Sequence, residues 1–321
     1  MHLPDAFLDG RTTLLAAGVA AAGMGIALRQ VKASLQPRQV PLLGLAGAFV
    51  FAAQMVNFPV PGGTSGHLLG GVLTAILLGP AAAVLVISCV LIVQCLMFAD
   101  GGLLALGANV FNMGIVSVCG GYATYRLVKN LIPANPHRSV VFAAAFAGWF
   151  GTVLASVTCA GQLAFSNTAP WNVTFPAMAN IHMLIGVGEG LATGLILLAI
   201  ARARPELLDE TLEPGTNHSG SPVVGLGLLV SVGLALFVAP FACPWPDGLE
   251  KVAQQLGFAN LLTTRLTGNI PAPMPEYRLP WVGSATIATA LAGACGTLLA
   301  FFAAYMFARA VVPSAPPAQK G

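Results

Sequence analysis

Nine apolar segments alternate with polar connections along the chain, and most are about as long as a membrane-crossing helix. They are predicted at 12–30, 40–56, 68–79, 81–98, 104–128, 139–164, 177–201, 222–242 and 281–308. A helix needs about 20 apolar residues to cross the bilayer, whereas the strands of a membrane β-barrel alternate apolar and polar residues. The pattern therefore predicts an all-α membrane protein with about nine transmembrane helices.

The third and fourth segments are separated only by Gly79-Pro80. Proline cannot continue a regular helix without a break, so we expect two helices here rather than one. The third segment is short for a full crossing. It is predicted to begin inside the protein, directly after a loop that contains His67.

A polar stretch at 203–221 divides the chain into two units. This stretch is first charged and then rich in Pro, Gly and Ser, which is typical of a linker. It separates a predicted seven-helix unit, 1–202, from a predicted two-helix unit, 222–321. The second unit has a long connection at 243–280, which contains the sequence ProAspGlyLeuGlu at 246–250.

The positions of the basic residues predict the orientation of the chain. Cytoplasmic loops of membrane proteins are enriched in Lys and Arg. If the N-terminus lies outside and nine helices cross, ten of the 14 basic residues fall on the inner side. His2 and His67 then both lie at the outer face of a plasma membrane. The linker at 203–221 lies on the cytoplasmic side.

The composition agrees with this class and excludes several others. Hydrophobic residues make up 56% of the chain and charged residues only 8%, compared with about 25% charged in soluble domains. The net charge of +3 is too small to indicate a nucleic-acid partner. The six cysteines form no CxxC pair, which argues against a thiolate metal site. The first ten residues contain Asp5 and Asp9 but no Lys or Arg, so we expect no cleaved leader.

The first two residues carry the candidate chemistry. The free amine of Met1, the backbone amide of His2 and the imidazole Nδ1 of His2 can close two fused chelate rings around one ion. Planar coordination by nitrogen favours Ni(II) or Cu(II), and low-spin Co(II) also fits. The alternative interpretation is an ordinary frayed terminus, because first residues are often poorly ordered.

His67 offers a fourth nitrogen from a glycine-rich loop, GlyGlyThrSerGlyHis at 62–67. Irregular backbone at membrane depth is tolerated where it is buried in protein or lines a cavity. We therefore predict a metal site made by Met1, His2 and His67. The alternative is a loop that starts the next helix, with Ser65 as its N-cap and His67 incidental.

Further polar residues lie near the predicted outer ends of the helices and are candidates for supporting the site. These are Asn57, Thr64, Ser65, Asp100, Asn109, Asn112, His182 and Glu189. Ionisable groups inside membrane segments are functional candidates. The structural alternative is hydrogen bonding between helices. For His182 and Glu189, seven residues apart on one helix face, we favour a structural pair.

Four stretches, at 1–8, 57–71, 98–114 and 182–190, resemble the CbiM/NikM family, the substrate-binding membrane component of cobalt/nickel energy-coupling-factor (ECF) transporters. The 222–321 unit is similar to the small accessory subunit that accompanies or is fused to this component. The resemblance implies that Ni(II) or Co(II) is the transported substrate. It implies that the ion is held by the Met1 amine, the His2 amide and ring, and the His67 ring. It also implies as partners a transmembrane coupling subunit and cytosolic ATPases.

Two other functions are compatible with this class of sequence. One is a carrier for a vitamin or another organic solute, but four Trp and four Tyr are few for such a pocket. The other is an assembly subunit that binds no ligand itself. An enzyme is not expected, because the chain contains neither an HExxH nor a GxSxG motif.

Overall fold

A computed structural model describes residues 1–132, 136–204, 221–261 and 272–312. The described part is built from helices, with one short antiparallel hairpin of β1 (Phe58–Val60) and β2 (Thr64–Gly66). The predicted all-α class is therefore confirmed. Residues 205–220, nearly all of the predicted linker, lie outside the described residues.

Every predicted apolar segment coincides with one helix or with a continuous run of helix. The elements are α1 (Gly10–Ser34), α2 (Val40–Gln54), α3 (Gly71–Leu78), α4 (Pro80–Phe98), α5 (Leu106–Asn109), the π-helical turn η3 (Val110–Val116), α6 (Ser117–Leu131), α7 (Pro136–Phe165), α8 (Trp171–Ala203), α9 (Ser221–Phe237), α10 (Gly248–Leu256) and α12 (Ala285–Val311). The elements α5, η3 and α6 follow one another directly and together fill the predicted fifth segment. Short 3-10 turns are Asp5–Phe7, Pro37–Gln39, Ala239–Phe241 and Pro275–Tyr277.

Six helices of the described part are long and apolar enough to cross a membrane by length and composition, namely α1, α4, α7, α8, α9 and α12. The predicted nine crossings therefore include three segments below this length. Of these, α2 has 15 residues and α3 has eight. The remaining one is the predicted segment 104–128, which the π-helical turn η3 divides into α5 and α6.

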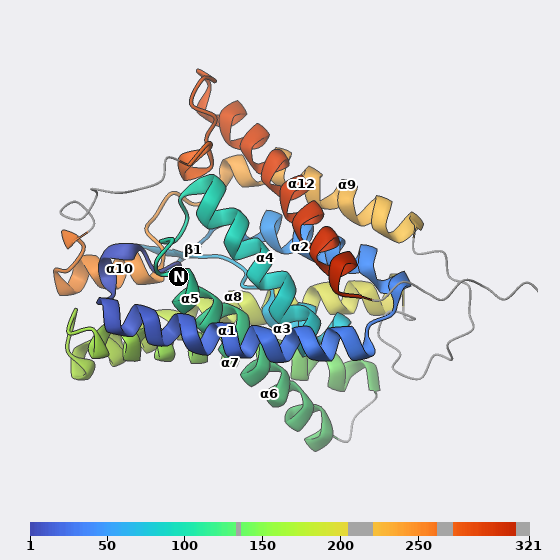
Figure 1. Ribbon diagram of the computed structural model, residues 1–321, viewed down its shortest axis with the longest axis horizontal. Helices are drawn as coiled ribbons and strands as arrows, with labels where there is room; N and C mark the ends of the chain where they lie inside the picture. The colour runs from blue at the N-terminus through green and yellow to red at the C-terminus, as the bar shows by residue number, and fades with distance from the viewer. Residues whose placement is uncertain (133–135, 205–220, 262–271, 313–321) are drawn as a thin grey trace, which may run out of the picture.

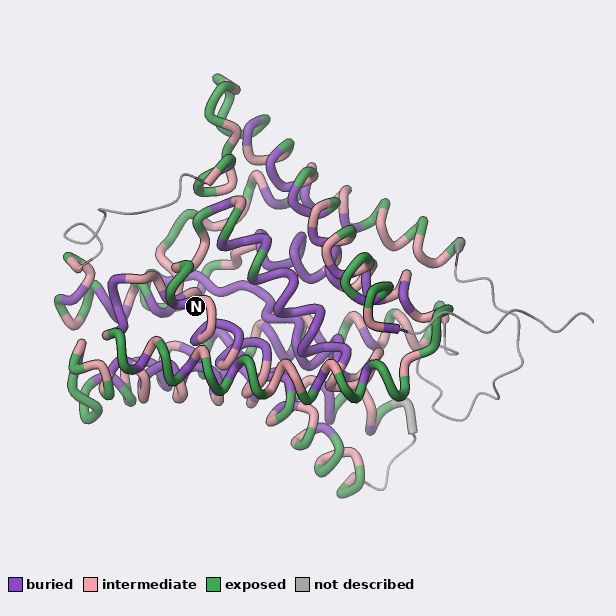
Figure 2. The backbone as a smooth tube through the Cα atoms, in the orientation of Figure 1, coloured by how far each residue is buried: buried purple, intermediate pink, exposed green. Residues whose placement is uncertain are grey.

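The break between α3 and α4 lies where the sequence predicts it. Gly79 has a φ of +85°, which favours glycine, and Pro80 is the first residue of α4. The first residues of α3 are buried, so this helix begins inside the protein, four residues after His67. Helix α4 is the most enclosed of the long helices and runs through the buried centre of the fold (Figure 2).

Small residues allow the helices to approach closely. At Gly190 of α8, an added Cβ would lie 2.5 Å from the carbonyl oxygen of Ala145 in α7. At Gly47 of α2, an added Cβ would lie 2.9 Å from the carbonyl oxygen of Ala300 in α12. The second contact joins the two predicted units, since α9 and α12 pack against α2 (Figure 1).

The long connection at 243–280 contains a helix that the hydrophobic pattern did not predict. Asp247 and Glu250 form a capping box at the start of α10, and Gly257 ends the helix in the left-handed conformation. The capping box thus gives the ProAspGlyLeuGlu sequence a structural role. Helix α10 packs against α8 and β2, which brings this connection onto the start of the chain (Figure 1).

Candidate metal centre

The start of the chain is buried and held in place by hydrogen bonds. The Leu3 amide donates to Asn109 Oδ1 at 2.8 Å, and the Asn109 amide group and the Gly102 amide both donate to the Leu3 carbonyl oxygen, at 3.1 and 2.9 Å. Met1 is 5% exposed and Leu3 is fully buried. The interpretation of a frayed terminus is therefore wrong for this chain.

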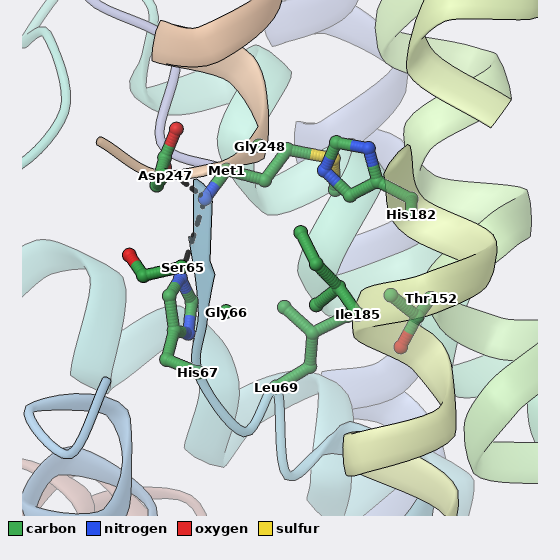
Figure 3. A pocket seen from close by; sticks show the side chains of 10 residues that line it. All are labelled: Met1, Ser65, Gly66, His67, Leu69, Thr152, His182, Ile185, Asp247 and Gly248. Carbon is green, nitrogen blue, oxygen red and sulfur yellow. Dashed lines mark hydrogen bonds and ion pairs between the residues drawn. The ribbon is translucent and has the colours of Figure 1, made fainter. Parts of the chain in front are cut away.

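The three predicted ligand residues come together at this point. The Met1 amine lies 3.2 Å from Nε2 of His67 (Figure 3). The rings of His2 and His67 are stacked, with 5.5 Å between their centroids and 21° between their planes. The amine and the two imidazoles, contributed by segments more than 60 residues apart in the sequence, thus lie next to one another.

His67 is in the form that metals bind. Its Nδ1 faces the Leu68 carbonyl oxygen at 3.1 Å, so Nδ1 carries the proton and the lone pair is on Nε2, toward the amine. Burial, followed by the positive charges of the Met1 amine and of His2, lowers the pKa of His67 to about 3. The ring is therefore neutral at physiological pH.

Two carboxylates surround the Met1–His2 unit. The Met1 amine donates to Asp247 Oδ2 at 2.6 Å, and His2 Nδ1 lies 3.2 Å from Asp100 Oδ1. Burial lowers the pKa of the amine, but the charge and hydrogen bond of Asp247 outweigh this, so that the pKa is raised. Burial likewise raises the pKa of Asp247, but the neighbouring amine outweighs it and lowers the pKa below its ordinary value. Burial lowers the pKa of His2 in spite of Asp100.

Glutamines and a tyrosine extend this polar network, and sequence reasoning did not identify them. His2 Nε2 lies 3.2 Å from Gln94 Oε1, and the Gln94 amide group donates to Gln54 Oε1 at 2.7 Å. Gln54 in turn donates to the Leu69 carbonyl oxygen at 3.0 Å. The Tyr277 hydroxyl donates to Asp100 at 2.5 Å. Glutamines in apolar helices were a usable signal, because such groups are buried only with partners.

The loop that carries His67 is fixed by the second unit. The Ser65 amide and the Thr64 hydroxyl donate to the Pro246 carbonyl oxygen at 2.8 and 3.0 Å. The Ser65 hydroxyl donates to the carbonyl oxygen of Trp245 at 2.8 Å. Ser65 is not the N-cap of the next helix, because that position belongs to Gly70, with φ of +73°.

The other supporting candidates have separate roles. The Asn57 carbonyl accepts from the Cys243 amide at 2.9 Å, which ties the same loop to the second unit. Asn112 exchanges hydrogen bonds with Gln162 at 2.7 and 3.1 Å, a packing contact between η3 and α7.

His182 and Glu189 do not form the structural pair that their spacing suggested. Glu189 accepts from the backbone amides of Leu69 and Gly70 at 2.5 and 3.1 Å, and so fixes the turn after His67. His182 directs Nδ1 toward the Met178 carbonyl oxygen at 2.8 Å. The N-cap residue of α3 provides no side-chain acceptor, and the Glu189 carboxylate accepts the hydrogen bonds of the amides before this helix instead.

Within the described residues, no group of three or more His, Cys, Asp or Glu side chains is placed to hold a metal. The candidate centre has a different composition. Two of its four nitrogens belong to the backbone, namely the terminal amine and the His2 amide. A set of ligands that includes these backbone nitrogens is compatible with planar nitrogen coordination.

Comparisons with known proteins identify the family of this chain. Residues 2–207 match the CbiM family, described as the cobalt uptake substrate-specific transmembrane region. The chain belongs to the CbiM family. Residues 221–312 of this CbiM-family chain match a second family, the PDGLE domain. The chain is thus a multi-pass membrane component for transport and not an enzyme, as predicted.

Relatives of this CbiM-family chain include fused proteins of similar length. A NikMN relative from Archaeoglobus fulgidus is 35% identical over 302 residues, covering 93% of this chain and 95% of its own. The fused nickel transport protein NikMN of Rhodobacter capsulatus is 31% identical and covers 93% of this chain and 94% of its own. A crystal structure of a truncated transition metal transporter is similar with a TM-score of 0.57 and 33% identity, covering 63% of this chain and 99% of that one.

We expect Asn109→Ala to loosen the start of the chain. The change removes both side-chain hydrogen bonds to Leu3, and each hydrogen bond contributes about 1 kcal/mol. Amide hydrogen exchange should be up to roughly thirtyfold faster at His2, Leu3 and Asp5, with unchanged exchange in α7 and α8. An unchanged exchange rate at these three residues would show that Asn109 does not anchor the terminus.

Proposed function

We propose that this chain captures Ni(II) or Co(II) at the outer face of the membrane. The four ligands are the Met1 amine, the His2 amide nitrogen, the His2 ring and the His67 ring. One observation carries the proposal: the amine and Nε2 of His67 lie 3.2 Å apart in a buried position, with the His2 ring stacked on His67. Both nitrogens can contact a single ion from these positions after small movements.

The electrostatics of the centre support a cation that is held and then released. Asp247 and Asp100 place two carboxylates beside the amine and His2. The ion replaces the proton on the amine, and His2 Nδ1 exchanges its contact with Asp100 for the metal. The same carboxylates compensate the positive charge of the amine, and accept from His2, when the ion leaves.

The fused unit takes part in the centre in this proposal. Residues 1–202 supply all four ligands, and residues 222–321 supply Asp247, which contacts the amine, and Tyr277, which contacts Asp100. The Pro246 and Trp245 carbonyl oxygens also fix the loop of His67. We infer that the second unit holds the terminus and the His67 loop in the positions that metal capture requires.

Transport itself requires partners. The sequence contains no GxxxxGK[ST] motif, so this chain does not supply ATP hydrolysis. We propose that it works with a transmembrane coupling subunit and cytosolic ATPases of an ECF complex. Nine segments cross the plasma membrane in this arrangement, and the N-terminus lies outside. Helices α3 and α4 are counted as two of the nine. The excess of basic residues on the inner side supports this orientation.

Calorimetric titration of the full chain in detergent tests this function. We expect one Ni(II) or Co(II) per chain, and an affinity that weakens as pH falls from 8 to 6. Binding releases one proton from the amine and one from the amide, so the Kd should rise about a hundredfold per pH unit at most. His67 does not add to this dependence, because its pKa of about 3 leaves it neutral throughout. Failure to bind either ion at pH 8 would exclude the proposal.

A further inference from the structure

One buried nitrogen beside the candidate centre is not used by the function proposed above. His182 lies in α8 and is 2% exposed. Its Nδ1 donates to the Met178 carbonyl oxygen at 2.8 Å, which leaves the lone pair on Nε2. Nε2 has no hydrogen-bond partner among the described residues. A buried polar atom of this kind ordinarily has a partner, and none of the described residues supplies one.

His182 lines a small cavity next to the Met1 amine. The cavity has a volume of about 10 Å³ and is shared with His67, Asp247 and Gly248 (Figure 3). This volume corresponds to about one water-sized sphere. At Gly248, an added Cβ would lie 2.8 Å from His182 Nε2, so the glycine of the second unit leaves the imidazole edge free.

His182 and His67 are prepared in the same way. Each directs Nδ1 to a backbone carbonyl oxygen, at 2.8 and 3.1 Å, and each lines this cavity. Nε2 of His67 contacts the Met1 amine, whereas Nε2 of His182 has no partner among the described residues. A histidine that binds a metal or a metal-bound group usually has its other nitrogen held by such a partner. His67 contacts the amine directly, whereas His182 borders the same small cavity from α8 (Figure 3).

We propose that His182 Nε2 holds a single water molecule, and that this water binds the captured ion as a fifth ligand from outside the plane of the four nitrogens. The inference depends on the proposed metal capture. The metal-bound water donates one hydrogen to Nε2, and its oxygen contacts the ion. His182 is a positioning residue in this arrangement and does not contact the ion itself.

The fifth ligand gives His182 a role in selectivity. Planar Ni(II) is stable with four nitrogens and gains little from a ligand above the plane. Planar Co(II) has one unpaired electron in the orbital that points out of the plane, so it readily takes a fifth ligand. The water held by His182 therefore favours Co(II) relative to a purely four-coordinate site.

The test compares His182→Leu, which removes the acceptor, with His182→Gln, which keeps an acceptor oxygen. Co(II)-loaded chain is prepared without oxygen in water enriched in ¹⁷O, and its electron paramagnetic resonance spectrum is recorded. We expect ¹⁷O broadening in the unsubstituted chain and in His182→Gln, and its loss in His182→Leu. The affinity for Co(II) should fall about tenfold in His182→Leu, with a change of less than about twofold for Ni(II).

Thr193→Val is the matched control. Thr193 is a buried residue of the same helix whose hydroxyl oxygen also has no partner among the described residues, and it does not line the cavity. Its substitution should leave the spectrum and both affinities unchanged. Loss of broadening or of selectivity in Thr193→Val would assign the effect to α8 in general and overturn the inference.

Two results separate this inference from the proposed function. Metal binding by the unsubstituted chain without ¹⁷O broadening would overturn the water ligand and leave the four-nitrogen site intact. This measurement decides the inference even if His182→Leu does not fold. Absence of any bound Co(II) or Ni(II) would overturn both.

Discussion

His67→Ala is expected to lower the affinity for Ni(II) and Co(II) by more than about a hundredfold, or roughly 3 kcal/mol. The change removes the one ligand that comes from outside the first two residues. The remaining amine, amide and His2 ring still chelate, so weak binding should persist. Calorimetric titration at pH 8 measures the difference directly.

The fold of the variant must be checked separately, because His67 is buried beside the amine. Thermal unfolding without metal measures the cost of removing this buried ring, which contacts the amine and stacks on His2. Gln30→Ala, at an exposed position of α1, is the surface control and should bind as the unsubstituted chain does. Equal affinities in all three chains would remove His67 from the site.

Adding two residues, Gly-Ser, before Met1 is expected to have the largest effect. The amine then no longer lies beside His67, and the extra residues must fit where Met1 is 5% exposed and contacts Asp247. The amine and the chelate ring that it closes are both lost. We expect the affinity to fall by about a thousandfold or more, roughly 4 kcal/mol.

The number of added residues matters for this experiment. One added residue would place histidine third in the chain, where the amine, two amides and the imidazole form a new set of four nitrogens. Two added residues avoid this. The same Gly-Ser pair added after Gly321 is the matched control and should leave binding unchanged. Tight binding by the N-terminal extension would exclude the amine as a ligand.

The helices could be predicted because each is specified by its own residues. Runs of apolar residues predicted all nine segments, and Gly79-Pro80 predicted the break before α4. Helix α10 was missed because its hydrophobic run is short. Its capping box of Asp247 and Glu250 is a local signal that would have indicated it.

The candidate site was predictable only in part. Met1, His2 and His67 are recognisable from chelate chemistry, since that chemistry is specific to a histidine in second position. Asp247 was not, because its contact with the amine depends on how a segment 246 residues away is placed. No local pattern encodes such a contact.

Glu189 shows why spacing alone misleads. Its separation from His182 places both on one face of α8, yet each finds a partner elsewhere. The backbone amides of Leu69 and Gly70 need an acceptor, and Glu189 supplies it at 2.5 and 3.1 Å. Buried polar groups pair according to the whole set of nearby donors and acceptors, which helix periodicity does not reveal.

A crystal structure of the full chain loaded with Ni(II), with anomalous scattering recorded at the nickel edge, tests the central claim most directly. The account predicts one strong peak within bonding distance of the Met1 amine, the His2 amide nitrogen, the His2 ring and His67 Nε2. A peak elsewhere, with the amine still paired to Asp247 and His67 unbound, would contradict it.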